Sequence, residues 1–402
     1  MELILQMGHG MQNISKELIK SWGKGKVIIS PSNFLHPGLD SVKKYADSIN
    51  KIGGEVLFDP QMFYPKNGHE KLKKYDYWVD ENTSITSEKG YTRIFQEILR
   101  INNEINALEI ILPGIDMNES NINYGVNWLL ESSLFFRGKS KKELLGTICL
   151  YSETIRNKDS VELLVEKLLS VDVDGYYIVA HQSNNEYINT DPLWWTGMMK
   201  LISCLKLNGK KVYVGYSSHQ SLLYSLANVD GIASGSYMNT RSFVPEKFKS
   251  DRDNGVKHKS TWYYVPQALC EYKASLLDVA LSRGFLDLFV PQGDFKNDYS
   301  AMLFNGAQPS STNYNETNSF MHYLHCLRLQ CNHLSKNTYE DTFAAYEFMI
   351  NSAEQEIKKI KSKGITGQNR DVTPSLEACK IALCANDEDY GFRLKMDWET
   401  IR

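Results

Sequence analysis

Carboxylate, amide and aromatic side chains gather in one segment, Phe58-Asp59-Pro60-Gln61-Met62-Phe63-Tyr64-Pro65. Asp59 and Gln61 could hydrogen-bond a planar heterocycle that Phe63 or Tyr64 sandwiches. A capped turn fits the same residues equally well, with Asp59 as the helix cap and the following proline at the first helical position. The segment therefore predicts either a pocket for a base or an ordinary helix start.

A second acid, Asp116, follows the apolar run that ends in Leu112-Pro113-Gly114. Two carboxyl groups at neighbouring positions could divide acid and base work, or one of them could attack an anomeric carbon. An aspartate two residues after a glycine is also a common turn residue. Asp59 and Asp116 are the candidate catalytic residues of this sequence.

Further polar side chains follow other apolar runs. His181-Gln182 comes directly after one of them and offers donors and acceptors to a base edge or a sugar. His181 could also ligate a metal, but no partner at metal-ligand spacing lies nearby, which favours hydrogen bonding. The candidate substrate-binding residues are Asn33, Gln61, Phe63, His181, Gln182, Tyr216 and Ser234.

These residues share one kind of position, because each lies at or near the end of a short apolar run. The first 235 residues hold eight such runs, at 3–9, 27–33, 56–61, 108–114, 144–149, 176–182, 212–216 and 231–235. Segments with helical periodicity separate the runs, and parallel strands need such crossovers. The pattern predicts an α/β fold, a (β/α)8 TIM-type barrel, with the chemistry at the carboxyl ends of the strands.

An open doubly wound sheet is the alternative architecture, but it more often has five to seven strands and a glycine-rich phosphate loop after the first. The sequence contains no GxGxxG or Walker A motif, which favours the closed barrel. We expect the barrel to occupy residues 1–300 and a mainly helical region to occupy 301–402. A short additional strand is expected at 286–290.

Composition fits a soluble globular protein of 402 residues, with 42% hydrophobic and 23% charged residues. The formal net charge of -3 argues against a general affinity for polyanions, although a local basic patch could still bind one. No apolar run is long enough to span a bilayer, so we expect no membrane partner. Seven scattered cysteines fit a reducing compartment, and the expected location is the cytoplasm.

Residues 241–262 form a basic excursion that ends in Trp262. Cations interleaved with aromatic residues could contact phosphates and stack on bases, which makes Arg241, Lys257 and Lys259 candidate nucleic-acid-binding residues. A surface loop followed by a buried aromatic strand is the other interpretation.

One cluster resembles a zinc site, and it comprises His322, His325, Cys326, Cys331 and His333. The surrounding residues have a helical pattern and no CxxC knuckle. We therefore expect a helix with incidental thiols, no metal and no cofactor.

Taken in order, the strand ends resemble those of the tRNA-guanine transglycosylase superfamily, including its DpdA-like branch, which is associated with inserting 7-deazaguanine bases into DNA. The similarity covers about residues 26–243. Its main pieces are Asp174-Gly175-Tyr176-Tyr177-Ile178, Lys211 to Tyr216 with Ser221-Leu222-Leu223, and Val229-Asp230-Gly231 through Asn239-Thr240-Arg241. Phe58-Asp59-Pro60-Gln61 stands where the family has Asp-Ser-Gly-Gly-Phe, whose aspartate contacts the base and assists catalysis.

The sequence departs from the family at its other functional positions. The last barrel strand, Gly231 to Gly235, lacks the nucleophilic aspartate. The family's base-reading glutamine corresponds to Cys149, the glycine pair after the sixth strand corresponds to Ala180-His181, and the zinc knuckle is absent. Either the alignment is shifted and Asp59 or Asp116 does the covalent work, or the protein is divergent or noncatalytic.

The resemblance implies a pentosyltransferase that exchanges or cleaves a base at the N-glycosidic bond of a nucleic acid or nucleoside. Its expected partners are tRNA or DNA and a purine or deazapurine base. The alternative is a noncatalytic paralogue that binds nucleic acid or a base as a subunit of a modification or defence complex, like the accessory subunit of the eukaryotic transglycosylase. Either a homodimer or a partner subunit fits this resemblance.

Overall fold

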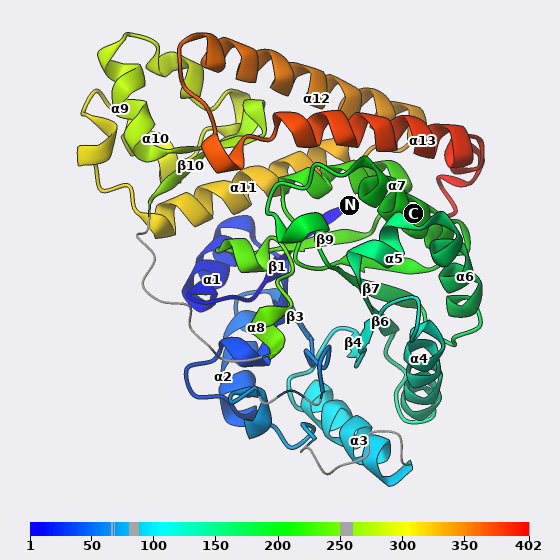
Figure 1. Cartoon of the computed structure of the whole chain (residues 1–402). Coiled ribbons are helices and arrows are strands. Elements are labelled where there is room, and N and C mark those ends of the chain that lie inside the picture. The colour runs from blue at the N-terminus through cyan, green and yellow to red at the C-terminus, as the bar shows by residue number, and fades with distance from the viewer. Residues whose placement is uncertain (66, 68, 80–87, 250–259, 402) are drawn as a thin grey trace.

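A computed structural model describes every residue of the chain except 66, 68, 80–87, 250–259 and 402 (Figure 1). Its central feature is a parallel sheet whose strands follow the order β3-β2-β1-β9-β8-β7-β6-β4. The eight strands are β1 (Glu2–Gln6), β2 (Gly25–Ile29), β3 (Gly54–Phe58), β4 (Ile110–Leu112), β6 (Leu144–Leu150), β7 (Gly175–Ala180), β8 (Lys211–Val214) and β9 (Gly231–Ser234). They coincide with the eight apolar runs, so the predicted strands are confirmed.

The sheet curls into a nearly closed barrel. The backbone N–H of Leu108, just before β4, donates to the carbonyl of Val56 in β3 at 2.9 Å and so links the two ends of the sheet. A two-residue strand, β5 (Asp116–Met117), pairs with the far end of β6. The predicted TIM-type architecture is therefore confirmed.

Helices connect the strands and cover the outside of the barrel. They are α1 (Met11–Trp22), α2 (Leu39–Asn50), α3 (Glu88–Glu104), α4 (Ile122–Arg137), α5 (Ser152–Arg156), α6 (Lys158–Leu168), α7 (Pro192–Leu207) and the 3-10 helix η4 (His219–Ala227). Local sequence sets several of their ends. The Asp191 carboxylate caps α7 by accepting from the N–H groups of Leu193 and Trp194, and Pro192 occupies the first helical turn.

Side chains alternate between the two faces of each strand. Ile4, Ile28 and Leu57 point into the lumen, whereas their neighbours, such as Leu3 and Leu5, join the core between the strands and the helices. All of these residues are buried. Because both faces are covered, the strands need continuous apolar runs, as the sequence has.

After β9 the chain leaves the barrel. It forms α8 (Glu246–Lys249), a hairpin of β10 (Trp262–Val265) and β11 (Cys270–Lys273), α9 (Ala274–Ser282), α10 (Asp298–Ala301), α11 (Glu316–Leu334), α12 (Tyr339–Ser362) and α13 (Thr373–Asp397). Helices α11, α12 and α13 lie together along one side of the barrel (Figure 1). The strand expected at 286–290 is wrong, because Leu286–Phe289 is a 3-10 helix, η7. None of the described helices has the length and apolar character that crossing a bilayer requires.

A buried ionic cluster joins this helical region to the barrel. The Glu271 carboxylate in β11 accepts from Arg241 Nη1 at 3.0 Å, from Arg370 Nη1 at 2.7 Å and from the Tyr187 hydroxyl at 3.0 Å. Burial alone would raise the pKa of Glu271, but Arg370 and Arg241 outweigh burial and hold this pKa at about 2. Three segments far apart in the sequence therefore meet on one carboxylate.

We expect Glu271→Gln to lower the free energy of unfolding at pH 7 by about 3 to 5 kcal/mol, because it leaves two guanidinium groups without their anion. Since the folded-state pKa is depressed, this contribution is present above the unfolded pKa and is lost as pH falls from about 5 towards 2. Urea denaturation across this pH range measures both effects. Glu354→Gln, which removes the more exposed pair with Lys380, is the control and should change stability far less.

Candidate functional site at the carboxyl ends of the barrel strands

Polar side chains extend the inward-facing rows of the strands beyond their carboxyl ends. Gln6 lies two residues after Ile4, Ser30 two after Ile28, and Asp59 two after Leu57. Since alternate residues share a face, each of these polar side chains continues the row that fills the lumen. The structure thereby places Asp59 at the carboxyl ends of the barrel strands, the end at which TIM-barrel enzymes have their active sites.

Asp59 is the centre of a buried hydrogen-bonded network. Its Oδ1 accepts from the backbone N–H of Gln61 at 2.9 Å. Its Oδ2 lies 3.5 Å from the Tyr177 hydroxyl and 3.4 Å from the Tyr216 hydroxyl. The Gln61 side chain donates to the Tyr216 hydroxyl at 3.1 Å, so the predicted residues Asp59, Gln61 and Tyr216 do come together.

The network continues across the lumen to β1 and β2. The Tyr177 hydroxyl donates to Gln6 Oε1 at 3.1 Å, and Gln6 Nε2 donates to Ser30 Oγ at 3.0 Å. Gln61 Oε1 accepts from the backbone N–H of Ser32 at 3.1 Å. One set of hydrogen bonds therefore connects segments from five strands, which fixes the positions of the polar groups around Asp59.

Backbone geometry at two of these positions is unusual. Gln61 has a φ of 54° and Tyr216 a φ of 51°, in the left-handed region that non-glycine residues seldom adopt. Such strain persists where surrounding contacts over-determine it, and it clusters at functional sites. Here the two residues that adopt it are the pair whose side chains hydrogen-bond each other beside Asp59.

Burial raises the pKa of Asp59 to about 7, although hydrogen bonds from Gln61, Tyr216 and Tyr177 oppose the shift. The carboxyl is 1% exposed, and no ion pair involves it among the described residues. A carboxyl that is half protonated near neutrality can both donate and accept a proton. Asp59 therefore has the electrostatic setting of a general acid or base.

Aromatic rings from the segments that follow β3 and β9 pack against this network at Tyr216. Phe63, Phe243 and Phe248 are buried and pack with Tyr216. The Phe63 ring is edge-on to Phe243 at 5.2 Å and to Phe248 at 5.1 Å, and Phe243 lies 5.3 Å from Tyr216 between ring centroids. The structure thus places Phe63 beside the Asp59 network, where its ring packs on Tyr216, Phe243 and Phe248.

A second polar group lies beside the aromatic rings and contains Asp116. The Tyr64 hydroxyl lies 3.1 Å from His181 Nε2, and the Tyr151 ring stacks on His181 at 4.4 Å. Burial raises the pKa of Asp116, while a hydrogen bond with Tyr151 and the charge of Lys249 oppose this. Burial also lowers the pKa of His181 to about 4, with a smaller effect of Lys249, so the imidazole is neutral at pH 7.

The two carboxyls belong to different hydrogen-bonded groups. The Phe243 ring contacts one residue of each group. Its centroid lies 5.2 Å from that of His181 and 5.3 Å from that of Tyr216. The backbone N–H of Asp116 donates to the Phe63 carbonyl at 3.0 Å, which ties the two groups together through the main chain. Asp116 is only half-buried, in contrast to Asp59.

Other predicted site residues have different surroundings. Asn33 Nδ2 lies 3.4 Å from the Met7 carbonyl, and Gln182 Oε1 accepts from Asn189, so both serve loop structure here.

The remaining predicted residues stand at the end of β9 or after it in the sequence. Ser234 follows the inward-facing Ala233 and faces Tyr323 of α11, outside the lumen, which is at odds with a base contact. Arg241 is buried against Glu271, where a nucleic acid cannot reach it. Lys257 and Lys259 fall outside the described residues.

Sequence reasoning missed several residues of the site. Gln6, Ser30 and Tyr177 could have been found by counting every second residue along each strand from an apolar inward-facing position. Phe243 and Phe248 carried no such signal, because they come from the segment after the last barrel strand. Their packing against Phe63 and Tyr216 is a tertiary contact.

The predicted histidine and cysteine cluster lies in α11. His322 Nε2 lies 2.8 Å from the Tyr264 carbonyl, and its Nδ1 contacts the Asn297 side chain. Among the residues that the structure describes, no group of three or more His, Cys, Asp or Glu side chains could hold a metal ion. The positions of His322 and Cys326 are those of buried helix residues.

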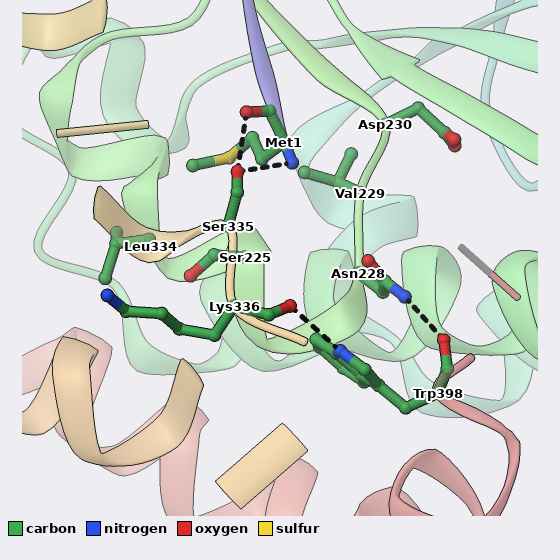
Figure 2. Close-up of a pocket in the computed structure, with 9 residues that line it drawn as sticks. All are labelled: Met1, Ser225, Asn228, Val229, Asp230, Leu334, Ser335, Lys336 and Trp398. Atoms are coloured by element: carbon green, nitrogen blue, oxygen red, sulfur yellow. Dashed lines mark hydrogen bonds between the residues drawn. The ribbon is translucent and has the colours of Figure 1, made fainter. Parts of the chain in front are cut away.

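A cavity of about 110 Å³ lies at the opposite end of the barrel, beside the start of β1 and the residues that precede β9 (Figure 2). The Met1 ammonium donates to Ser335 Oγ there, and Asn228 donates to the Trp398 carbonyl. The N-terminal ends of barrel strands serve stability rather than catalysis. This cavity is therefore separate from the candidate site.

We expect Gly215→Ala to disturb the Asp59 network, because the added Cβ would lie closer than 3.0 Å to the Tyr177 hydroxyl. Displacing Tyr177 breaks its contacts with Gln6 and Asp59 and should lower the free energy of unfolding by about 1 to 3 kcal/mol. Denaturant titration measures this. Gly138→Ala, where the new Cβ meets only ordinary contacts, is the matched control, and equal effects of both substitutions would contradict the assignment.

The raised pKa of Asp59 predicts a second stability effect. Between about pH 4 and 7 the folded protein binds more protons than the unfolded chain, so stability decreases as pH rises and the cost is complete above 7. Asp59→Asn removes this cost, which amounts to roughly 4 kcal/mol at most. The variant should gain stability over the wild type at pH 8 and lose this advantage near pH 4, as urea titrations at both pH values would show. A pH-independent difference would contradict the shift.

No protein-family model matches the chain, and neither does any curated protein. Among solved structures it is similar to a thermostable mutant of a xylanase from Cellvibrio japonicus. The two chains share 10% sequence identity with a TM-score of 0.36, over 58% of this chain and 85% of that chain. A likeness at this level carries no argument about the site.

Proposed function

We propose that the protein is an enzyme that acts at the N-glycosidic bond of a nucleic acid or nucleoside, by base exchange or cleavage. The observation that carries the proposal is the Asp59 carboxyl, buried at the catalytic end of a TIM barrel with a pKa of about 7. A departing base needs a proton, and a carboxyl poised near neutrality can supply it and later take it back. The resemblance to tRNA-guanine transglycosylases agrees with this role.

In the proposed reaction the two carboxyls have different tasks. Asp59, in its protonated form, donates a proton to the base as the bond between the base and C1′ of the ribose breaks. Asp116, which is half-buried and faces the positive charge of Lys249, attacks C1′ or stabilises the positive charge that develops there. In base exchange, the incoming base displaces the Asp116 carboxylate and returns its proton to Asp59.

Neighbouring residues supply recognition. The Gln61 amide and the Tyr216 hydroxyl present hydrogen-bonding groups to the edge of a base, and Phe63 and Phe243 offer aromatic surfaces for stacking. Neutral His181 and the Tyr64 hydroxyl lie on the side of Asp116, where sugar hydroxyls would bind. The exposed Lys249 over the Tyr64 ring is suited to a phosphate.

A noncatalytic subunit that binds nucleic acid or a base is the second candidate. The end of β9, Ala233-Ser234, carries no carboxylate, although the resembled family has its nucleophile there. The buried aromatic cover over Asp59 also favours binding without chemistry. A noncatalytic subunit of a modification or defence complex would keep the barrel fold even without a carboxylate at the end of β9 and with the Asp59 network covered.

Incubation with radiolabelled guanine and either tRNA or DNA distinguishes the two functions. We expect label to enter one nucleic acid, and Asp59→Asn to slow incorporation by about 100-fold or more, because the proton donor is lost. Asp116→Asn should slow it comparably, whereas Asp40→Asn, on the outer surface of α2, should have no effect.

Salt-sensitive nucleic-acid binding without label incorporation would favour the noncatalytic subunit. Incorporation that survives in Asp59→Asn would contradict the assigned role of Asp59 while leaving the reaction class in place. Measuring the stability of each variant in parallel separates a chemical loss from an unfolded protein.

A further inference from the structure

Residues 235–249, which follow β9, pass the carboxyl ends of the barrel strands. Phe243 forms an isolated bridge with His181 of the β7 loop and fixes this segment there. Helix α8 follows and spans only Glu246–Lys249. Glu246, Lys247 and Lys249 are exposed, whereas Phe248 is 5% exposed, so a single apolar side chain anchors the helix.

The Phe248 ring inserts among aromatic residues from three different segments. It stacks on Phe243 with an interplanar angle of 22° and a centroid distance of 5.1 Å. It stands edge-on to Phe63 at 5.1 Å and to Tyr216 at 5.9 Å. Stacked and edge-on contacts of this kind would also accommodate the flat ring of a heterocyclic base.

The ring also contacts the Asp59 network. Tyr216 touches Phe248 through its ring and Asp59 through its hydroxyl, and the hydroxyl also accepts from Gln61. A flat ligand in the place of Phe248 would therefore lie beside the two side chains assigned to the base edge. Phe248 itself has no polar atom, so the Gln61 amide and the Tyr216 hydroxyl bond one another and their neighbours Ser32 and Asp59 instead.

We propose that Phe248 is an intramolecular occupant of the base site and that α8 must be displaced before a substrate can bind, which makes this contact autoinhibitory. The inference rests on the proposed function for the nature of the competing ligand. The arrangement favours displacement, because α8 is a single turn whose one buried side chain is Phe248. The exposed Lys249 adds a contact over the Tyr64 ring at 4.8 Å and a charge interaction with Asp116. A nucleic acid that attracts Lys249 would weaken this contact and help to withdraw Phe248.

Hydrogen exchange tests the displacement without any ligand. The backbone N–H of Gln61 is bonded to Asp59 beneath the aromatic cover, so its exchange rate reports opening of this region. We expect Phe248→Ala to raise this rate by about 10-fold or more and Phe248→Leu to raise it less, with the β7 amides unchanged. Phe289→Ala, which removes a buried ring packed on Tyr272 in the helical region, is the matched control and should leave Gln61 protected.

Calorimetric titration with guanine tests the competition. If Phe248 occupies the base site, Phe248→Ala should bind guanine about 10-fold more tightly than the wild type, because the closed population no longer competes. Phe289→Ala should bind guanine with the wild-type affinity. Both results together support the proposal.

Hydrogen exchange and guanine titration test separate parts of the proposal. Unchanged exchange at Gln61, or an equal loss of protection in β7, would overturn the displaceable cover. Equal guanine affinity of the wild type and Phe248→Ala would overturn the competition while the proposed function stands. Faster exchange at Gln61 with no guanine binding by either protein would support the displaceable cover and overturn guanine as its competitor, and with it the base assignment of the proposed function.

Discussion

The lumen of the barrel has to be filled by side chains that come from every second residue of eight strands. Apolar residues satisfy this requirement over most of its length, with Ile4, Ile28 and Leu57 in one part and Tyr177 and Tyr213 in another. At the carboxyl end the same rows continue as polar residues. Because the space around them stays closed to water, each polar group there must find its partner inside the barrel.

Asp59 is the residue on which this constraint acts most strongly. A carboxylate in such a position would normally be neutralised by a cation, and elsewhere in the molecule Glu271 is held by two arginines. Asp59 has hydroxyl and amide partners instead, and its pKa rises to about 7 where that of Glu271 falls to about 2. A buried carboxyl with neutral partners therefore gains and loses its proton near pH 7, whereas a buried carboxyl paired with cations stays ionised at pH 7.

Residues 235–249, which follow β9, reach both the ionic cluster and the Asp59 network. Arg241 pairs with Glu271 in the ionic cluster, and Phe243 and Phe248 pack on Tyr216 of the network. The buried ion pair at Arg241 and the single turn of α8 suit the proposed displacement of α8, because short elements with few buried side chains open most easily. In the proposed function these rings must therefore move apart before a base can reach the Asp59 network, whether the protein acts on that base or only binds it.

The sequence by itself determined the eight strands, the barrel and the position of Asp59, because apolar runs with polar ends are dictated by local periodicity and by strand direction. It also determined that Gln61 and Tyr216 each follow the end of a strand. Only the tertiary structure decided that Arg241 is buried in an ion pair, that Ser234 faces α11 and that Phe248 lies over the site. These outcomes depend on contacts between segments far apart in the chain, for which a run of residues carries no periodic signal. The pKa of Asp59 belongs to the same class, since it reflects burial and hydrogen bonds from residues of other strands, Tyr177 and Tyr216.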